Sequence, residues 1–360
     1  MNLRELNRAT LARQLLLERS SLTPLAAIER LVAMQAQVAR PPFIGLWTRL
    51  ARFSREQLCT LLHDRKVVRV TALRATLHLM TARDYIALRP ALQPMLTQIM
   101  QALLKQRAAV IDIPKLSAYA ATLLPATFDQ LRPQLAKKFT KTDERALGYA
   151  VRTQLPLVQL PTTADRWAFP ASAQFAAAAT YLDKPIAATA EPHELVRRYL
   201  AAFGPATIKD AQIWSGIRDL KPAFEALRPE LVTFRDDKQR ELFDLPTAPR
   251  PPATTPAPAR FLPDFDNLVL GHDDRRRIVS DADRKHIVTK NLLVKATFLV
   301  DGFVAGTWTI ERKKAAATLR LTPFAPLKKP ARAELEREGE SLLRFVEPDA
   351  TAFSISVSAA

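Results

Sequence analysis

The chain has 360 residues, is 48% hydrophobic, and carries 53 Lys and Arg against 36 Asp and Glu, a formal net charge of +17. This length predicts two to four compact units at roughly 100–200 residues each, and the positive potential favours phosphate backbones or anionic lipid as partners. Because no apolar run approaches the roughly 18–20 residues of a membrane span and the N-terminus lacks the apolar core of a secretory signal, nucleic acid is the stronger expectation and a membrane the weaker one.

The first predicted elements are two helices. Apolar residues at helical spacing run through residues 3–19, and Thr23 followed by Pro24 is a cap residue with proline at the first helical position. The apolar face of this second helix continues to Gln35. Pro41-Pro42 is expected to end it, because a residue before proline is disfavoured in the helical region.

A further helix and a β-hairpin are expected to complete this unit. Ser54 can cap a helix that leads into β-prone runs at 67–71 and 74–80. Helices followed by a two-stranded hairpin at this spacing predict a winged helix, a variant of the helix-turn-helix.

The same order of elements returns twice further along the chain. The second copy is expected to open with a helix at 142–144 and to continue with strands at 155–160 and 167–169. The third copy is the clearest, with three short helices and an alternating hairpin. Its elements are expected at residues 191–200, 204–214, 222–227, 231–234 and 241–245.

The composition changes after the third copy. Residues 247–260 are rich in proline and predict a semi-rigid linker or surface loop. Strands at 290–300 and 303–310 then flank Asp301-Gly302, a strong short hairpin signal. A third strand, a helix and a last strand are expected at 315–321, 330–346 and 352–357.

The predicted fold class is therefore α+β, with three tandem winged-helix domains and a small β-rich C-terminal domain. The expected division of the chain is 1–100, 101–190 and 191–246 for the winged helices, 247–260 for the linker and 261–360 for the C-terminal domain.

Four stretches, in this order, carry a resemblance to a known family. They are Met34–Val38 with Pro41-Pro42, Arg74–Met80, Phe261–Leu268 leading into Gly271–Arg275, and Asp301–Trp308. Together they resemble the AlkZ/YcaQ-like winged-helix DNA glycosylases over nearly the whole chain. The resemblance implies a C-shaped, basic channel for double-stranded DNA, excision of N7-alkylated purines, and no cofactor.

The pair Gln35 and Gln37 matches the catalytic Gln-x-Gln motif of one branch of that family. This branch is linked to self-resistance against DNA-alkylating antibiotics and acts on bulky adducts or interstrand crosslinks, whereas the other branch carries Gln-x-Asp. The resemblance therefore implies a monofunctional DNA glycosylase in which Gln35 and Gln37 are catalytic and the preferred purines are bulky or crosslinked.

Amide side chains suit this reaction only if it needs no strong base. Neither glutamine titrates near neutrality, but alkylation at N7 already makes the purine a cationic leaving group. The remaining task is to stabilise an oxocarbenium-like sugar and to deliver water to its C1′. A glutamine carbonyl can accept a hydrogen bond from that water while the other amide orients it, and both carbonyl dipoles face the developing positive charge.

The spacing of the two glutamines sets a geometric condition. In a continuous helix, residues i and i+2 point in about opposite directions, whereas in extended backbone they share a face. Gln35 and Gln37 can serve one water only if the helix breaks near Ala36. The alternative is structural: Gln35 would cap the apolar stripe of the helix and Gln37 would be solvated.

Three more residues are candidates for catalysis or positioning. His78 could bond a phosphate or position the sugar, or it could be a half-buried histidine satisfied by the backbone. Asp264 and Asp266 could place a carboxylate beside the oxocarbenium, or they could cap and brace the exit of the linker, since Asp-x-Asp-Asn is typical of turns.

Basic residues at three places are candidate DNA contacts, although each could instead form a solvated face. They flank the turn of the first hairpin, form a run after the linker, and lie at the far end of the C-terminal hairpin. These residues are Arg69, Arg74, Arg275, Arg276, Arg277, Lys313 and Lys314.

Other kinds of site are poorly supported by the sequence. Cys59 and His63 share a helical face, but two ligands do not make a zinc site, and the eight glycines form no phosphate-loop or dinucleotide motif. Neither a metal nor a cofactor is expected. The single cysteine forbids an internal disulfide and is typical of a reducing cytoplasm, so the cytoplasm is the expected location. Association with the nucleoid and a monomeric state are also expected.

Two alternative functions stay open. The first is a non-enzymatic winged-helix DNA-binding protein or transcriptional regulator, although three winged helices in one chain favour encirclement of DNA over the dimeric binding of regulators. The second is a nucleoid-type structural protein, which would bind DNA in a salt-sensitive way without preference for a lesion.

Overall fold

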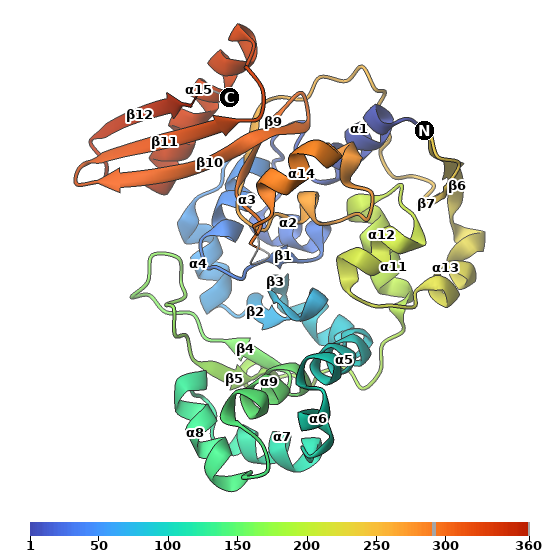
Figure 1. The fold of residues 1–360 in the computed structure, drawn as a ribbon, viewed down its shortest axis with the longest axis vertical. Coiled ribbons are helices and arrows are strands. Elements are labelled where there is room, and N and C mark those ends of the chain that lie inside the picture. Colours follow the sequence, from blue (N-terminus) through green and yellow to red (C-terminus); the bar gives the residue numbers. More distant parts are fainter. Residues whose placement is uncertain (290–292, 359–360) are drawn as a thin grey trace.

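In the part of the chain that the structure describes, two five-stranded sheets and a separate two-stranded hairpin, with helices packed around them, form a mixed α+β fold (Figure 1). A computed structural model describes residues 1–289 and 293–358. Within these ranges, no helix combines the length and the apolar character of a membrane span.

The α-helices are α1 (Leu3–Arg13), α2 (Pro24–Leu31), α3 (Pro41–Arg49), α4 (Arg55–His63), α5 (Ala82–Leu104), α6 (Gln106–Ala109), α7 (Ile113–Thr122), α8 (Phe128–Lys138), α9 (Glu144–Gln154), α10 (Ala178–Leu182), α11 (Pro192–Phe203), α12 (Ile208–Ser215), α13 (Lys221–Leu227), α14 (Asp281–Ile287) and α15 (Lys329–Val346). Short 3-10 turns are η1 (Leu73–Ala75), η2 (Arg228–Glu230), η3 (Asn267–Val269) and η4 (Arg275–Arg277).

The strands are β1 (Met34–Gln35), β2 (Val67–Thr71), β3 (Leu77–Thr81), β4 (Leu157–Gln159), β5 (Phe175–Ala177), β6 (Val232–Arg235), β7 (Glu241–Asp244), β8 (Arg260–Leu262), β9 (Thr297–Val300), β10 (Phe303–Lys313), β11 (Ala316–Pro323) and β12 (Ala352–Val357).

The predicted second helix begins where expected but ends early. Thr23 caps α2, its hydroxyl accepting from the Ala26 amide at 3.2 Å. The helix stops at Leu31 because Val32 has a φ of 67°, outside the helical region, so the expectation that it reaches Gln35 is wrong. Pro41-Pro42 does not end this helix either. The two prolines open α3, where the first turn tolerates proline because its amides have no partner inside the helix.

The first sheet joins the hairpin of the first predicted unit to that of the second. Its order is β1-β3-β2-β4-β5, and β2 pairs with β4 through Arg69 opposite Gln159. On its other side β4 pairs with β5, so the second strand of this hairpin is Phe175–Ala177 and not the strand predicted at residues 167–169. The boundary expected at residue 100 also falls inside α5. The division into domains stays a proposal.

The elements expected for the third copy lie where the sequence predicts them. Helices α11, α12 and α13 are followed by the hairpin β6–β7, whose register runs from Val232 opposite Asp244 to Arg235 opposite Glu241. The Pro-rich segment that follows is not a free linker. It lies along α1, where Arg4 Nε donates to Ala253 O at 2.8 Å.

The C-terminal sheet has the order β12-β11-β10-β9-β8. The turn between β9 and β10 is made by Asp301 and Gly302, with φ of 49° and 82°, as the Asp-Gly signal predicts. Of the strand expected at 290–300, residues 290–292 lie outside the described residues and residues 297–300 form β9. Helix α15 connects β11 to β12, which run parallel.

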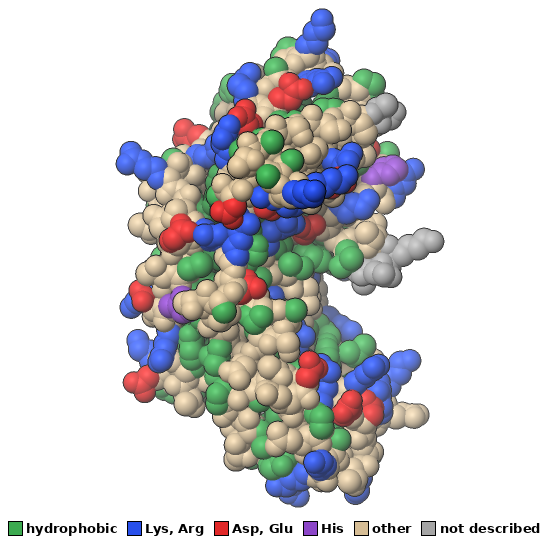
Figure 2. Space-filling model, turned by 90° about the vertical axis from the view of Figure 1, so that its left-hand side faces the viewer, with side chains coloured by type: hydrophobic (Ala, Val, Ile, Leu, Met, Phe, Trp, Pro, Cys, Tyr) green, Lys and Arg blue, Asp and Glu red, His purple; other side chains and the backbone are tan. Residues whose placement is uncertain are grey.

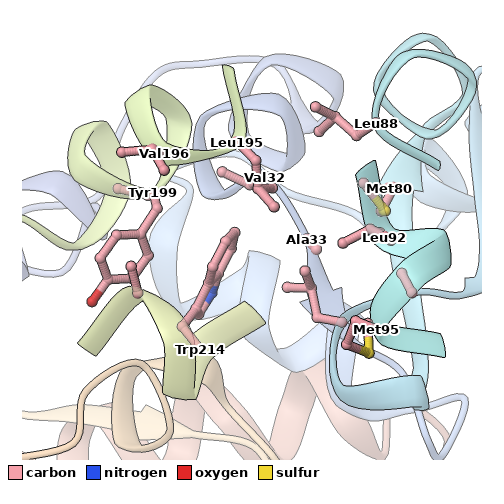
Figure 3. Close-up of a cluster of buried hydrophobic side chains, with 14 of the residues drawn as sticks. Val32, Ala33, Met80, Leu88, Leu92, Met95, Leu195, Val196, Tyr199 and Trp214 are labelled. Atoms are coloured by element: carbon pink, nitrogen blue, oxygen red, sulfur yellow. The ribbon is translucent and has the colours of Figure 1, made fainter. Parts of the chain in front are cut away.

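One buried core fixes the chain just before the two glutamines (Figure 3). Val32 and Ala33, which follow α2, pack among side chains of α5, β3, α11 and α12. Trp214 of α12, with no exposed surface, is the largest side chain in this cluster. Since close-packed interiors allow little movement, the start of β1 has a fixed position relative to several distant elements.

Candidate active site

The segment from Ala33 to Gln37 is held by the sheet on one side and by an arginine on the other. In the pairing of β1 with β3, Gln35 lies opposite His78, and the Ala36 amide donates to Leu77 O at 2.7 Å. Arg69 Nε donates to Ala36 O at 2.8 Å, and its Nη2 donates to Gln37 O at 3.2 Å. The backbone at Gln35 is therefore extended, because the helix breaks at Val32, before the position near Ala36 that the sequence predicts.

The two glutamine side chains line different spaces. Gln35 is 9% exposed and lines a cavity of about 20 Å³ together with Asp264, Asp266 and Asn267. This volume has room for one water molecule. Gln37 is exposed and lines an open cleft of about 810 Å³. The two residues do not share one cavity, because β1 ends at Gln35 and the chain bends at Gln37.

A network around Arg74 orients the amide of Gln35. Arg74 Nη2 donates to Gln35 Oε1 at 2.8 Å and to Asn267 Oδ1 at 3.0 Å. Arg74 Nη1 donates to Trp214 O, and Asn267 Nδ2 donates to Ala33 O at 2.9 Å. The guanidinium therefore fixes which end of the Gln35 amide is the carbonyl, and it uses one of the two lone pairs of Oε1. The second lone pair can accept a hydrogen bond from water.

The expectation that Arg69 and Arg74 contact DNA is corrected by the structure, which places both side chains inside the protein. Arg69 is 5% exposed, and its guanidinium stacks on Phe169 at 4.9 Å. Burial lowers the pKa of each arginine to about 10, so both stay charged at neutral pH. Arg69 donates to the carbonyl oxygens of Ala36 and Gln37, and Arg74 donates to Gln35, Asn267 and Trp214. These two arginines therefore hold the segment of Gln35 and Gln37 in place.

His78 has no exposed surface, which rules out the expected contact with a phosphate or sugar in this conformation. Its Nδ1 lies 3.1 Å from Thr76 O, an acceptor, so Nδ1 carries the proton. Nε2 is then an acceptor, and it is buried without a partner among the described residues. Burial, followed by the nearby charge of Arg74, lowers the pKa of His78 to about 3. The imidazole is neutral at physiological pH.

Protonation of His78 is expected to destabilise the fold in acid. The unfolded chain binds a proton near pH 6.5, whereas the folded chain does not bind it until about pH 3. Across this window the unfolded state holds more protons, so the free energy of unfolding falls as the pH drops, by at most about 1.4 kcal/mol per pH unit. Urea unfolding of wild type and His78→Gln between about pH 6.5 and pH 4 should show a shallower decline for the variant. The exposed His63, changed to Gln, is the matched control, and equal slopes for all three proteins would contradict the expectation.

The two aspartates of the cavity have different roles. Asp266 forms a buried bidentate ion pair with Arg49, with both N–O distances at 2.9 Å, and its Oδ1 accepts from the Leu268 amide at the start of η3. It is the brace that the alternative hypothesis describes. Asp264 is only partly buried, and its Oδ1 accepts from the Ala296 amide at 3.2 Å. Asp264 therefore remains the carboxylate that can face a positive charge beside Gln35.

The three arginines from Arg275 to Arg277 lie in different environments. Arg277 is 2% exposed and donates to Pro205 O at 2.8 Å. The expectation that it contacts DNA is therefore corrected, because its side chain is buried. Arg276 forms two hydrogen bonds to Asp274, at 2.9 and 2.6 Å. Arg275 lines an open pocket of about 630 Å³ that Arg284 and Lys285 also line, and it stays a candidate phosphate contact.

Lys313 and Lys314 are exposed at the turn between β10 and β11. Figure 2 shows Lys and Arg side chains in a band across the upper part of the molecule, where Figure 1 places the C-terminal sheet. It also shows an indentation between this part and the lower lobe, the part of the molecule in which Figure 1 labels α8, α9, β4 and β5. Both lysines are exposed, and their contact with a phosphate backbone stays a prediction.

Several residues of the site were not singled out from the sequence. Asn267 lies within a stretch that carries the family resemblance, so its signal was present. Arg132 and Arg152, which line the cleft beside Gln37, have no distinguishing motif. Their placement depends on how α8 and α9 pack beside β4, and no local pattern shows that.

Comparisons with known proteins agree with this architecture. The family described as "DNA glycosylase AlkZ-like" matches residues 28–345. The "Interstrand DNA cross-link repair glycosylase" of Streptomyces sahachiroi is 26% identical, over 92% of this chain and 93% of that protein. The solved structure of the Streptomyces sahachiroi DNA glycosylase AlkZ matches with a TM-score of 0.79 at 21% identity, over 99% of this chain and 100% of that chain, which shows a likeness of fold.

The fold, together with the matched range that includes Gln35 and Gln37, defines this protein's class as that of the DNA glycosylases. More narrowly, the chain belongs to the AlkZ-like DNA glycosylase family, as the sequence motifs predict. Assignment to the Gln-x-Gln branch stays a prediction.

Proposed function

We propose that this protein is a monofunctional DNA glycosylase that excises N7-alkylated purines from double-stranded DNA, with Gln35 and Gln37 at the reaction centre. The observation that carries the proposal is the orientation of the Gln35 amide by Arg74 at a cavity of about 20 Å³. Such a cavity can hold one water, and Asp264 contributes a carboxylate to its lining.

The chemistry follows from the charge of the damaged base. The bond between C1′ and N9 breaks, and its electron pair neutralises the cationic purine, which leaves without needing a proton. The carbonyl of Gln35 holds the water that forms the new C1′–O bond. The carbonyl dipoles and the Asp264 carboxylate stabilise the oxocarbenium-like sugar, and the water's proton passes to Asp264 or to solvent.

Bulky or crosslinked purines are the proposed substrates, and self-resistance to a DNA-alkylating natural product is the proposed role. Support comes from the Gln-x-Gln pattern of Gln35 and Gln37 and from the printed name of the Streptomyces relative, which refers to interstrand cross-link repair. The proposed architecture is three winged-helix units in a C-shaped arrangement. The proposed oligomeric state is a monomer, located in the cytoplasm and associated with the nucleoid.

A base-release assay tests this function. The protein is incubated with duplex DNA that contains 7-methylguanine, or a bulky N7 adduct, and abasic sites are detected by alkaline cleavage. Release of the modified base, with undamaged DNA left intact, is the expected result. Tight DNA binding without release from any N7-alkylated duplex would favour a regulator or a structural protein instead.

Arg74 is expected to act as a positioning residue. Arg74→Lys keeps the charge but loses the planar arrangement of donors that reaches Gln35, Asn267 and Trp214 together. We expect the single-turnover rate of base release to fall about tenfold, as for loss of a hydrogen bond to a charged group, while the affinity for DNA stays unchanged. Arg332→Lys, which alters an exposed pair with Glu336 on α15 instead, is the control. An unchanged rate for Arg74→Lys at normal stability would show that this orientation is irrelevant.

A further inference from the structure

The cleft beside Gln37 holds more positive charge than its own carboxylates neutralise. It has a volume of about 810 Å³ and lies where the β1–α3 connection, β2, α8, α9 and the loop before β5 meet. In Figure 1, α8, α9, β4 and β5 belong to the lower lobe, and β1 and α3 lie above it. The charged residues of the lining are Arg40, Arg69, Arg132, Arg152, Asp129 and Asp165.

Arg69 and Arg152 are the arginines of this lining that burial largely removes from water, and Arg152 has fewer polar partners than Arg69 among the described residues. Within the described residues the Arg152 side chain makes one hydrogen bond, from Nε to Thr71 Oγ1 at 3.3 Å, and no ion pair. Burial, together with the charge of Arg132, lowers the pKa of Arg152. A guanidinium that is largely removed from water without a counter-ion is unfavourable. An anion in the cleft would relieve this cost.

A second observation points to a ligand in the same place. Gln159 is 8% exposed and lines the cleft, yet its Oε1 is buried without a hydrogen-bond partner among the described residues. Most buried polar atoms are paired. Because the two ends of an amide can exchange by rotation, this side chain can offer either an acceptor or an NH₂ donor to a bound group.

The positive charge of the cleft also disfavours a cationic ligand. An N7-alkylated purine is cationic, and a space with four arginines and two aspartates repels it. A phosphate group carries the complementary charge and is the group that paired guanidinium donors bind most strongly. Arg132 also lines an adjoining pocket of about 290 Å³ with Arg145 and Arg152, so the positive surface continues away from Gln37.

We propose that the cleft beside Gln37 binds one phosphate of the DNA strand through Arg132 and Arg152, and that this contact sets the register of the sugar at the glutamines. The inference rests on the proposed function, since it assigns the anion to the substrate of that reaction. Gln159 supplies a further polar contact, and Phe128 forms an apolar wall.

The salt dependence of DNA binding tests the proposal with the intact protein. The binding constant for a 7-methylguanine duplex, and for the same duplex undamaged, is measured between low and moderate salt for wild type, Arg152→Gln and Arg132→Gln. Loss of one phosphate contact lowers the slope of log K against log salt by about 1 and weakens binding about tenfold at low salt. Arg332→Gln, on the exposed face of α15, is the charge-matched control and is expected to leave the slope unchanged.

The outcomes separate this inference from the proposed function. Unchanged slopes for both cleft variants, at wild-type melting temperature, would overturn it even if base release were normal. If both variants reduce the salt slope but the wild type releases no base, only the proposed function is contradicted. If Arg152→Gln fails to fold, the more exposed Arg132→Gln decides alone. Inorganic phosphate distinguishes the source of the anion: thermal stabilisation of wild type but not of Arg152→Gln, with unchanged DNA slopes, would assign the site to a free anion and overturn the proposal.

Discussion

Gln37→Ala is expected to lower the single-turnover rate of base release about hundredfold or more, the usual effect of removing a preorganised polar group from a reaction centre. Gln37 is exposed, and its Oε1 accepts from the Leu77 amide at 3.3 Å. Because this is one long hydrogen bond at the surface, the variant should fold nearly as wild type and bind DNA with similar affinity. Gln35→Ala is expected to lower the rate by a similar factor. It also leaves Arg74 without one of its acceptors, which adds a loss of stability of about 1–3 kcal/mol.

The measurement is abasic-site formation under enzyme excess on a 7-methylguanine duplex, with circular dichroism and thermal unfolding as checks of the fold. Gln101→Ala, an exposed glutamine of α5, is the matched control and should keep the full rate. If Gln35→Ala and Gln37→Ala both release the base at the wild-type rate, the reaction centre lies elsewhere in the protein.

Asp266→Ala is expected to cost about 3–5 kcal/mol of unfolding free energy, the range found when one partner of a buried ion pair is removed. Arg49 and Asp266 have 2% and 4% exposed side chains, so the remaining guanidinium would be buried without a counter-charge. The substitution also removes the acceptor for the Leu268 amide. Urea unfolding followed by circular dichroism measures this loss.

Asp264→Ala is the informative comparison, because it removes from the same cavity a carboxylate that forms no ion pair with any described residue. Its expected cost is about 1 kcal/mol, for one hydrogen bond to the Ala296 amide, together with a slower base release. Wild-type stability in Asp266→Ala combined with slow release would reverse the two assignments and make Asp266 the carboxylate of the reaction centre.

Local signals in the sequence predict much of the fold. The cap at Thr23, the β-prone run at 67–71 and the Asp301-Gly302 turn each depend on neighbours within a few residues, and the structure has these elements at the predicted positions. The run at 74–80 forms a strand only from Leu77, because Leu73–Ala75 make a 3-10 turn. Pro41-Pro42 was misread because proline is compatible both with the residue after a helix and with the first turn of the next one. Only the left-handed conformation of Val32 decides between the two.

The candidate site was predicted less completely, because burial depends on partners far along the chain. Arg277 and Arg69 look like surface cations in the sequence, but Arg277 donates to Pro205 O and Arg69 to Ala36 O. Asp266 looks like a turn residue, and its partner Arg49 lies more than two hundred positions earlier. The pair Gln35 and Gln37 was found through its motif, and the Arg74 network that orients Gln35 was not.

The Arg74 network has a consequence for how the protein is made. Gln35 is oriented by Arg74, which in turn depends on Trp214 and Asn267. At about 5–20 residues per second of synthesis, the nascent chain carries its two glutamines for roughly 10–50 s before Asn267 is added. During that time, and in any product truncated before Asn267, the amide of Gln35 lacks its full support. The proposed activity, which would leave abasic sites in the genome, is thus completed only late in translation, when most of the chain has been synthesised.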